Sequence, residues 1–269
     1  MIQVAVNGAA GRMGRELIIA CQRDDALELV AAFEAPGSQA IGQDAGRLAT
    51  GEDLDVMIAS ADDRADAVFD VLVDFTRPEP CLAAVGDCVV KNAAIVIGTT
   101  GFDTDQMAEI NAAAEKIAVV MAPNFSAGVN LTLKLLEMAA KALGDSVDIE
   151  VIEAHHRHKV DAPSGTALRI GEVLADATGR SLDDCAVYAR HGNTGERERE
   201  TIGFQTIRGG DIVGEHTVLF AGDGERLEIS HKASSRQTFA GGAMRAAGWA
   251  ADKPAGRYDM NDVLGLAQG

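Results

Sequence analysis

Short apolar runs alternate with longer helical stretches along the first half of the chain. Strands are predicted over residues 2–6, 27–33, 71–75, 94–97 and 117–121. Helices are predicted over residues 12–22, 80–92 and 104–116, the last with Thr104 as its N-cap, and residues 35–55 are predicted to be irregular surface chain. Continuous apolar strands separated by helices are typical of a parallel sheet that is covered on both faces. The first half is therefore predicted to be a doubly wound α/β domain.

The pattern changes after residue 121. An amphipathic helix is predicted over residues 129–143, followed by a strand over 148–154, a loop over 155–164 and a helix over 166–177. Three further strands, 204–208, 215–221 and 226–232, are separated by glycine turns that favour antiparallel pairing, and helix returns after residue 238. We therefore expect a second, α+β domain with a mixed or antiparallel open sheet.

Composition narrows the class of partner. The chain has 24 Lys and Arg against 41 Asp and Glu, a formal net charge of −17, which argues against nucleic acid and anionic membranes as partners. No apolar stretch reaches the roughly 18 residues of a membrane span. Four scattered cysteines form no CxxC pair and suggest neither a zinc knuckle nor a disulfide framework, so they are predicted to be small apolar residues. A cytoplasmic protein is the expectation.

A glycine motif joins the first predicted strand to the first helix. Residues 8–14 have the spacing GxxGxxG, which allows a tight turn and brings backbone N–H groups to a pyrophosphate at the helix N-terminus. Glu34 ends the second strand, where an acidic side chain can accept hydrogen bonds from adenosine ribose hydroxyls. We predict a Rossmann-like nucleotide site made by the following residues: Gly8, Ala9, Ala10, Gly11, Arg12, Met13 and Glu34.

Two later loops follow predicted strands at the sheet edge where ligands bind in open α/β sheets. Both could face a nicotinamide, although either alone would more often be an ordinary turn. Their residues are Gly98, Thr99, Thr100, Ala122, Pro123, Asn124 and Phe125.

The sequence EAHHRHKVDAPSGT, residues 153–166, concentrates three His, one Arg and one Lys in an acidic chain. It leads into a predicted helix start at Ser164, Gly165 and Thr166, where free N–H groups would bind a carboxylate or phosphate. His155 supplies a proton donor near neutral pH and Lys159 a second donor or a charge clamp. Together they indicate an anion site with acid–base chemistry.

Three other readings of the charged segments stay open at this point. The first takes His155, His156, His158 and Asp161 as metal ligands, although no zinc scaffold surrounds them, and we predict no metal. The second is a solvated basic loop, and the third a nucleotide-binding regulator without catalysis. Residues 232–236 add basic charge that ends at Arg236, whereas the alternating charges of 196–200, with Arg190, are predicted to be a solvated face.

Taken in order, these motifs resemble the dihydrodipicolinate reductase family over essentially the whole chain. The resemblance rests on residues 8–14, 73–76, 98–101, 123–126, 153–167, 210–216 and 232–236. It implies NADH- or NADPH-dependent reduction of 4-hydroxy-tetrahydrodipicolinate, a dicarboxylate, to tetrahydrodipicolinate in the diaminopimelate route to lysine. It also implies a nucleotide domain of residues 1–126 with a return over 236–269, and a substrate domain of 127–235 that builds a homotetramer.

The resemblance further implies individual roles. His155 and Lys159 would provide acid–base chemistry and the proton, and the substrate carboxylate would be held by His156, Ser164, Gly165, Thr166 and Arg236. One position departs from a common family pattern, in which Arg follows the acidic residue at the end of the second strand. Here Ala35 follows Glu34, so no adjacent cation meets a 2′-phosphate, and NADH is expected to be used at least as well as NADPH.

Overall fold

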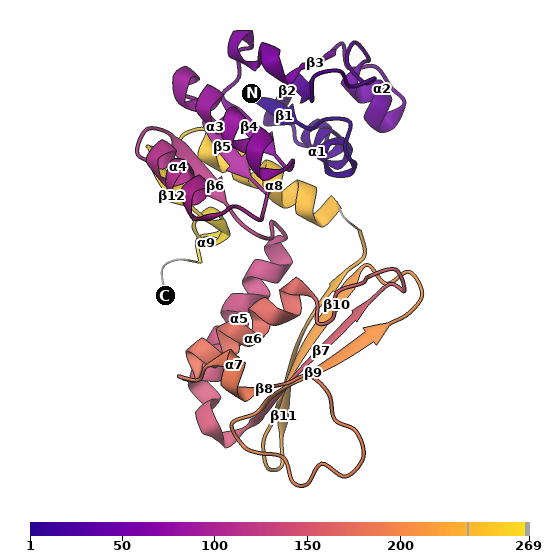
Figure 1. The fold of residues 1–269 in the computed structure, drawn as a ribbon, viewed down its shortest axis with the longest axis vertical. Helices are drawn as coiled ribbons and strands as arrows, with labels where there is room; N and C mark the ends of the chain where they lie inside the picture. Colours follow the sequence, from indigo (N-terminus) through magenta and orange to yellow (C-terminus); the bar gives the residue numbers. More distant parts are fainter. Residues whose placement is uncertain (236, 267–269) are drawn as a thin grey trace. The chain divides into compact units, whose positions relative to one another are not determined.

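A computed structural model describes residues 1–235 and 237–266. The chain forms two compact units (Figure 1), one made by the chain up to residue 127 together with the chain from 237 onward, the other by residues 128–236. Each unit has its own hydrophobic core.

Seven parallel strands form the sheet of the first unit. They are β1 (Ile2–Asn7), β2 (Leu27–Glu34), β3 (Ile58–Ser60), β4 (Val71–Asp74), β5 (Ala94–Ile97), β6 (Ala118–Met121) and β12 (Gly256–Tyr258). Their order is β12-β6-β5-β4-β1-β2-β3. The chain therefore reverses direction across the sheet between β1 and β4, the switch point at which such sheets bind ligands. The predicted doubly wound, Rossmann-like fold is confirmed.

Helices cover both faces of this sheet (Figure 1). They are α1 (Arg12–Gln22), α2 (Ala45–Thr50), η1 (Ala61–Asp66), α3 (Pro78–Lys91), α4 (Thr104–Ala114), α8 (Gln237–Ala250) and α9 (Met260–Leu264). One core cluster contains α1 and α8, and the other contains α3 and α4. The C-terminal α8 thus completes the first unit although it is distant in sequence. In the described chain, no helix has both the length and the apolar character needed to cross a membrane.

Two local predictions for the first unit were wrong. Residues 35–55 are not wholly irregular, because α2 forms there with Asp44 as its N-cap, whose carboxylate also accepts bonds from the N–H groups of Leu54 and Val56. The N-cap of α4 is Asp103 rather than Thr104, since Asp103 and Gln106 form a reciprocal capping box. The edge strand β12 was not predicted, because its three residues are too few to show a period in the sequence.

A five-stranded mixed sheet forms the second unit, in the order β11-β10-β7-β9-β8. Its elements are α5 (Ala127–Leu143), η2 (Gly144–Ser146), β7 (Asp148–His155), α6 (Gly165–Ala177), α7 (Leu182–Cys185), β8 (Ala186–Val187), β9 (Ile202–Arg208), β10 (Gly214–Ala221) and β11 (Arg226–Ala233). Inward side chains of β7, β9 and β10 pack with α5 and α6 in one core cluster.

We expected the strands at 204–208 and 215–221 to pair with each other in an antiparallel arrangement, and this was wrong. β9 runs parallel to β7, and β10 lies on the other side of β7, antiparallel to it. The glycines at 209 and 210 therefore open a connection that crosses the end of β7 instead of closing a hairpin. The C-terminal ends of β7 and β9 consequently meet at one edge of the sheet, with His155 in register with Arg208.

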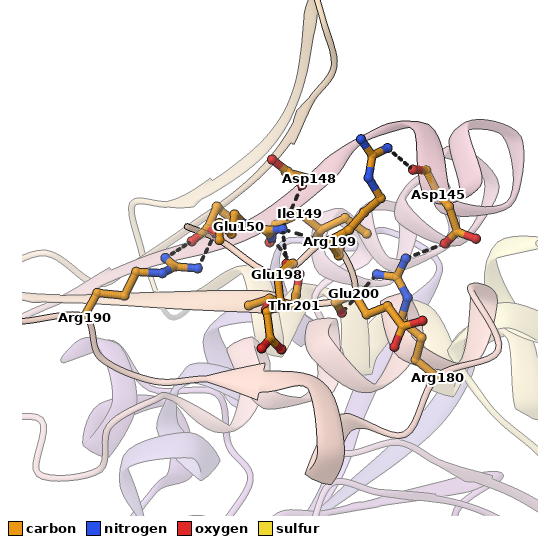
Figure 2. A network of polar contacts seen from close by, with 11 residues as sticks. Asp145, Asp148, Ile149, Glu150, Arg180, Arg190, Glu198, Arg199, Glu200 and Thr201 are labelled. Atoms are coloured by element: carbon orange, nitrogen blue, oxygen red, sulfur yellow. Dashed lines mark hydrogen bonds and ion pairs between the residues drawn. The ribbon is translucent and has the colours of Figure 1, made fainter. Parts of the chain in front are cut away.

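The predicted solvated face is largely exposed, and two of its arginines also form an ion-pair network with β7 (Figure 2). Arg190 donates two bonds of 2.8 and 2.9 Å to the carboxylate of Glu150 on β7, and Arg197 donates to the same carboxylate at 3.0 Å and to Asp148 at 2.8 Å. Arg197 also donates to the Ile149 carbonyl. Burial raises the pKa of Glu150, but the two guanidinium groups outweigh it and hold that pKa below its ordinary value. The network fixes the segment before β9 to β7.

The cysteines are structural, as predicted. Cys21, Cys81 and Cys88 are buried, and Cys185 is half-buried. Burial raises the pKa of the Cys21 and Cys88 thiols to about 12, with a smaller contribution from nearby aspartates. Because the thiolate is the reactive form, these buried side chains are chemically inert near neutral pH.

A substitution at Gly14 tests how closely α1 packs against the glycine loop. A Cβ at Gly14 would overlap the carbonyl oxygens of Gly8 and Ala9, whereas a Cβ at Gly86 in α3 meets nothing within 4 Å. We expect Gly14→Ala to lower the free energy of unfolding by about 1–3 kcal/mol, the usual cost of overpacking. Gly86→Ala should be neutral or stabilising because alanine favours helix. Urea denaturation of both variants measures this, and equal midpoints would contradict the close approach.

Candidate active site

The carboxylate of Glu153 lies near the C-terminal ends of β7 and β9 and holds several elements together there. It points inward from β7 and is 1% exposed. His155 Nδ1 lies 2.6 Å from Oε2, and the backbone N–H of Ser164 donates to Oε1 at 3.0 Å. Arg208 of β9 donates one bond of 2.7 Å to each oxygen. Three separate elements therefore converge on one buried anion.

These partners determine the charge state of Glu153. Burial raises its pKa, but the hydrogen bonds from Arg208, His155 and the Ser164 N–H outweigh burial and hold the pKa below its ordinary value. Hydrogen bonding to Glu153 likewise raises the pKa of Arg208. An ionised carboxylate only accepts hydrogen bonds, so Nδ1 of His155 must carry its proton. That leaves Nε2 of His155 as the nitrogen that can exchange a proton.

A second buried histidine supports the first. His216 of β10 is 5% exposed, and its ring packs edge-on to His155 with centroids 5.2 Å apart. Its Nε2 lies 3.0 Å from the hydroxyl of Ser164, while its buried Nδ1 has no partner in the described part of the chain. Burial, followed by the neighbouring His155, lowers the pKa of His216 to about 4. His216 is therefore neutral near pH 7.

Ser164 prepares the start of α6 for an anion. Its hydroxyl accepts a bond from the Ala167 N–H at 3.1 Å and so caps the helix. The N–H groups of Gly165 and Thr166 find no acceptor among the described residues, and they carry the positive end of the helix dipole. A carboxylate placed there would meet two free donors. Arg236, the other predicted contact, lies outside the described residues.

The basic loop divides into a buried and an exposed part. Lys159 Nζ lies 2.8 Å from Asp161 Oδ2, and this ion pair lowers the pKa of Asp161. His156 has a buried Nδ1 that meets no partner among the described residues, and its ring lies 6.1 Å from that of His158. Within residues 1–235 and 237–266, no three His, Cys, Asp or Glu side chains are arranged to hold a metal ion. Of the three histidines in this loop, His155 is the one that contacts Glu153.

The glycine loop of the first unit leaves donors free at the start of α1. Gly8 has a positive φ of 73°, and a Cβ there would lie 2.7 Å from the Thr76 methyl. Gly11 is the N-cap of α1 and has no side chain to satisfy the first turn. The N–H groups of Arg12 and Met13 accordingly find no acceptor in the described chain. This arrangement fits a pyrophosphate.

Glu34 stands beside that loop. The N–H groups of Gly8 and Ala9 both donate to the Phe33 carbonyl, at 2.9 and 3.0 Å, which ties the loop to the end of β2. Partial burial of Glu34 raises the pKa of its carboxyl. The next residue is Ala35, so no cation adjoins Glu34 in sequence.

A buried polar cluster supports the ends of the central strands. Asp74 is fully buried at the end of β4 and accepts bonds from the Asn7 amide at 2.6 Å and from the Thr99 hydroxyl at 2.7 Å. The Thr76 N–H and hydroxyl also bond to it, at 3.0 and 2.9 Å, and Arg64 reaches the cluster through Asn7. Asp74 therefore ties together the loops that follow β1, β4 and β5.

The two later loops are placed at the predicted edge, but some of their side chains face inward. Thr99 is buried on Asp74, and Phe125 is buried with its ring 5.5 Å from that of Phe75. The Asn124 side chain accepts a bond from the Ser126 N–H at 2.9 Å. What these loops can offer a nicotinamide is therefore mainly backbone and the exposed side chains of Thr100 and Pro123.

Sequence reasoning gave no role to three of the residues around His155. Glu153 had a usable signal, because it lies two positions before His155 and so on the same face of a strand whose other inward residues, Ile149 and Val151, are apolar. Arg208 and His216 had none. Their approach depends on β9 pairing with β7 in parallel and on β10 pairing on the other side, which no local pattern encodes.

Comparison with known proteins places this geometry in context. A family model described as Dihydrodipicolinate reductase, N-terminus, matches residues 2–125, and one described as Dihydrodipicolinate reductase, C-terminus, matches residues 128–264. The 4-hydroxy-tetrahydrodipicolinate reductase of Alkalilimnicola ehrlichii is 60% identical over 272 residues, covering 98% of this chain and 99% of that protein.

Two solved structures are similar to this chain over almost its whole length. A dipicolinate-bound dihydrodipicolinate reductase from Paenisporosarcina sp. TG-14 has a TM-score of 0.77 and 25% identity, covering 96% of this chain and 97% of its own. The WlbA dehydrogenase of Thermus thermophilus, in complex with NAD and UDP-GlcNAcA, has a TM-score of 0.54 and 15% identity, covering 96% and 97%. At that identity the second likeness concerns the fold alone.

The neutral His216 makes stability depend on pH. As pH falls below about 6.5 the unfolded chain protonates this ring, whereas the folded protein does so only near 4, so the folded state loses stability across that window. From pH 7 to pH 5 the contribution of His216 to this loss is about 2 kcal/mol. His216→Gln, which cannot titrate but can still bond Ser164, should lose correspondingly less in urea denaturation. An equal loss in both proteins would contradict a neutral His216.

Proposed function

Because the chain belongs to the dihydrodipicolinate reductase family, we propose that its two units divide the work of that reaction between nucleotide binding and substrate chemistry. The predicted activity is confirmed at the level of the family: a nicotinamide-dependent reductase of 4-hydroxy-tetrahydrodipicolinate in the diaminopimelate route to lysine. The product is tetrahydrodipicolinate. The roles of individual residues below are our assignments.

The first unit holds the nucleotide. The free N–H groups at the start of α1 and the close approach allowed by Gly8 suit a pyrophosphate, and Glu34 suits the ribose hydroxyls. The loops at 98–100 and 122–125 lie at the ends of β5 and β6, on the nicotinamide side of the switch point. Bound NADH or NADPH supplies the hydride that reduces the ring.

The second unit holds the dicarboxylate. The unsatisfied N–H groups of Gly165 and Thr166 at the start of α6 bind one substrate carboxylate, for which we also assign His156 as a contact, and Ser164 keeps the helix start in place. In an acidic protein, this helix terminus and the basic loop provide the positive potential that such a substrate needs. The bound ring is thereby oriented before reduction.

The proton comes from the same edge. His155 carries a proton on Nδ1 toward Glu153, so Nε2 is the atom that takes up a second proton from solvent and gives it to the electron-rich ring produced by reduction. Lys159 is the second donor, held in the loop by Asp161. The single observation that carries this assignment is the buried, ionised Glu153, because it determines which nitrogen of His155 is free.

We further assign a homotetramer and a cytoplasmic location. The tetramer would form through the face of the second sheet opposite α5 and α6. Alternate side chains of β7 and β10 on that face, among them Ile152 and Leu219, are half-buried, and the neighbouring Ile207 of β9 is 50% exposed. Apolar side chains on the open face of a sheet support association with further copies.

A coupled assay tests the reaction. Substrate is generated in place by a synthase acting on pyruvate and aspartate semialdehyde, and the loss of NADH or NADPH absorbance is followed. We expect rapid oxidation only when the synthase product is present. Protein that binds NADH in calorimetry but does not oxidise it with this product would refute the proposed function.

His155 and Lys159 should each matter mainly for turnover. His155→Gln and Lys159→Ala remove proton donors, so we expect kcat in the coupled assay to fall by about 10²- to 10³-fold, with a smaller change in KM for His155→Gln. His158→Gln changes a ring in the same loop that contacts neither Glu153 nor Ser164 and should leave kcat nearly unchanged. Full turnover in either donor variant would withdraw its role.

Cofactor choice follows from Glu34. A carboxylate without an adjacent cation repels a 2′-phosphate, so NADH should serve at least as well as NADPH. Arg12 and Arg15 are the cations that could still reach that phosphate. The ratio of the two kcat/KM values measures the balance, and a preference for NADPH above about tenfold would overturn this interpretation of Glu34.

A further inference from the structure

We propose that Glu153 and Arg208 are positioning residues that fix the tautomer of His155 and so determine which of its ring nitrogens carries the resting proton. This inference rests on the proposed function, because it presumes that His155 delivers the proton. It adds two residues, one on β7 and one on β9, to which the proposed function gives no role.

In every hydrogen bond around Glu153, the carboxylate is the acceptor. Its Oε2 accepts from Arg208 and His155, and its Oε1 accepts from Arg208 and the Ser164 N–H, with the Thr206 hydroxyl at 3.4 Å. Every group that faces the carboxylate is a donor. A His155 ring turned so that an unprotonated nitrogen faced Oε2 would place two acceptors 2.6 Å apart, and that arrangement is repulsive.

Arg208 maintains this pattern. Its two parallel bonds of 2.7 Å keep Glu153 ionised and hold the plane of the carboxylate. Arg208 also donates to the Asp161 carbonyl at 2.6 Å, so the same guanidinium ties the basic loop to β9. Without it, a buried Glu153 would tend to take up a proton. A protonated carboxyl could then donate to Nδ1, which would invert the tautomer.

The environment leaves His155 little freedom to compensate. It is 8% exposed, its carbonyl accepts the Gly209 N–H at 2.9 Å, and its ring packs against neutral His216. A Cβ at Gly214 would lie 3.1 Å from Nε2, so the absence of a side chain at Gly214 leaves room beside that nitrogen. The ring is therefore held by packing, and Glu153 selects its protonation pattern.

Glu153→Gln separates tautomer control from packing. The amide keeps the shape of the carboxylate but replaces one acceptor with an NH2 donor. At the Oε1 position that NH2 would face the Ser164 N–H and Arg208, which cannot become acceptors. At the Oε2 position the NH2 would face Arg208 as well, but its other neighbour is His155, which can release its Nδ1 proton and accept. We therefore expect the variant to hold His155 as a neutral ring with its single proton on Nε2. Without the Glu153 carboxylate to stabilise a positively charged ring, His155 is then a poorer proton donor.

The experiment uses the full-length protein and two readouts. Isotope-labelled histidine NMR, with His155 assigned by comparison with His155→Gln, reports which ring nitrogen is protonated. The coupled assay reports kcat and KM. In Glu153→Gln we expect the protonated nitrogen to change from Nδ1 to Nε2, and kcat to fall by about 10²-fold, with both KM values nearly unchanged. Thr206→Val, which removes only the 3.4 Å bond to Glu153, is the matched control and should match the wild type.

Each outcome decides the question. An unchanged kcat in Glu153→Gln, or a lower kcat with His155 still protonated on Nδ1, would refute positioning. Full turnover in His155→Gln would instead refute the proposed role of His155, and the NMR result would still decide whether Glu153 controls its tautomer. If Glu153→Gln fails to fold by circular dichroism, Arg208→Lys replaces it. That variant keeps the charge but not the paired bonds, and we expect about a 10-fold loss in kcat, since an unchanged value would refute the role of Arg208.

Discussion

The burial of one carboxylate constrains the whole catalytic edge of the second unit. An isolated anion in that position would cost several kcal/mol, so Glu153 is compatible with the fold only if donors surround it. They come from β7, β9 and the start of α6. The parallel β9, the N-terminus of α6 and the His155 ring are thereby held in one arrangement, and the direction of the His155 hydrogen bond follows from it.

The first unit also has a buried carboxylate that holds the loops of its proposed ligand site. Asp74 is buried at the end of β4 and gathers the loops after β1, β4 and β5 through Asn7, Thr76 and Thr99. In each unit a buried carboxylate fixes the loops, while a neighbouring helix begins with N–H groups that nothing in the described chain satisfies. Fixed loops and free donors are what an anionic cofactor and a dicarboxylate substrate require.

The sequence predicts best what depends on neighbouring residues. The apolar runs of β1 and β5, the glycine loop and the start of α6 were found because strand period, turn chemistry and helix capping act over a few residues. The Arg208–Glu153 pair and the fixing of Arg197 on β7 were not, because 55 and 49 residues separate the partners and pairing of β9 with β7 brings them together. The parallel direction of β9 was missed for the same reason, since a glycine turn is compatible with a hairpin and with a crossing connection.

A double-mutant cycle on kcat tests most directly whether Glu153 works through His155. Its corners are the wild type, Glu153→Gln, His155→Gln and the double variant, all compared in the coupled assay. If Glu153 acts only by directing the His155 proton, its substitution has nothing left to remove once His155 is gone, and the double variant will be no slower than His155→Gln. Losses that multiply in the double variant would show that Glu153 acts independently of His155, and they would contradict the account.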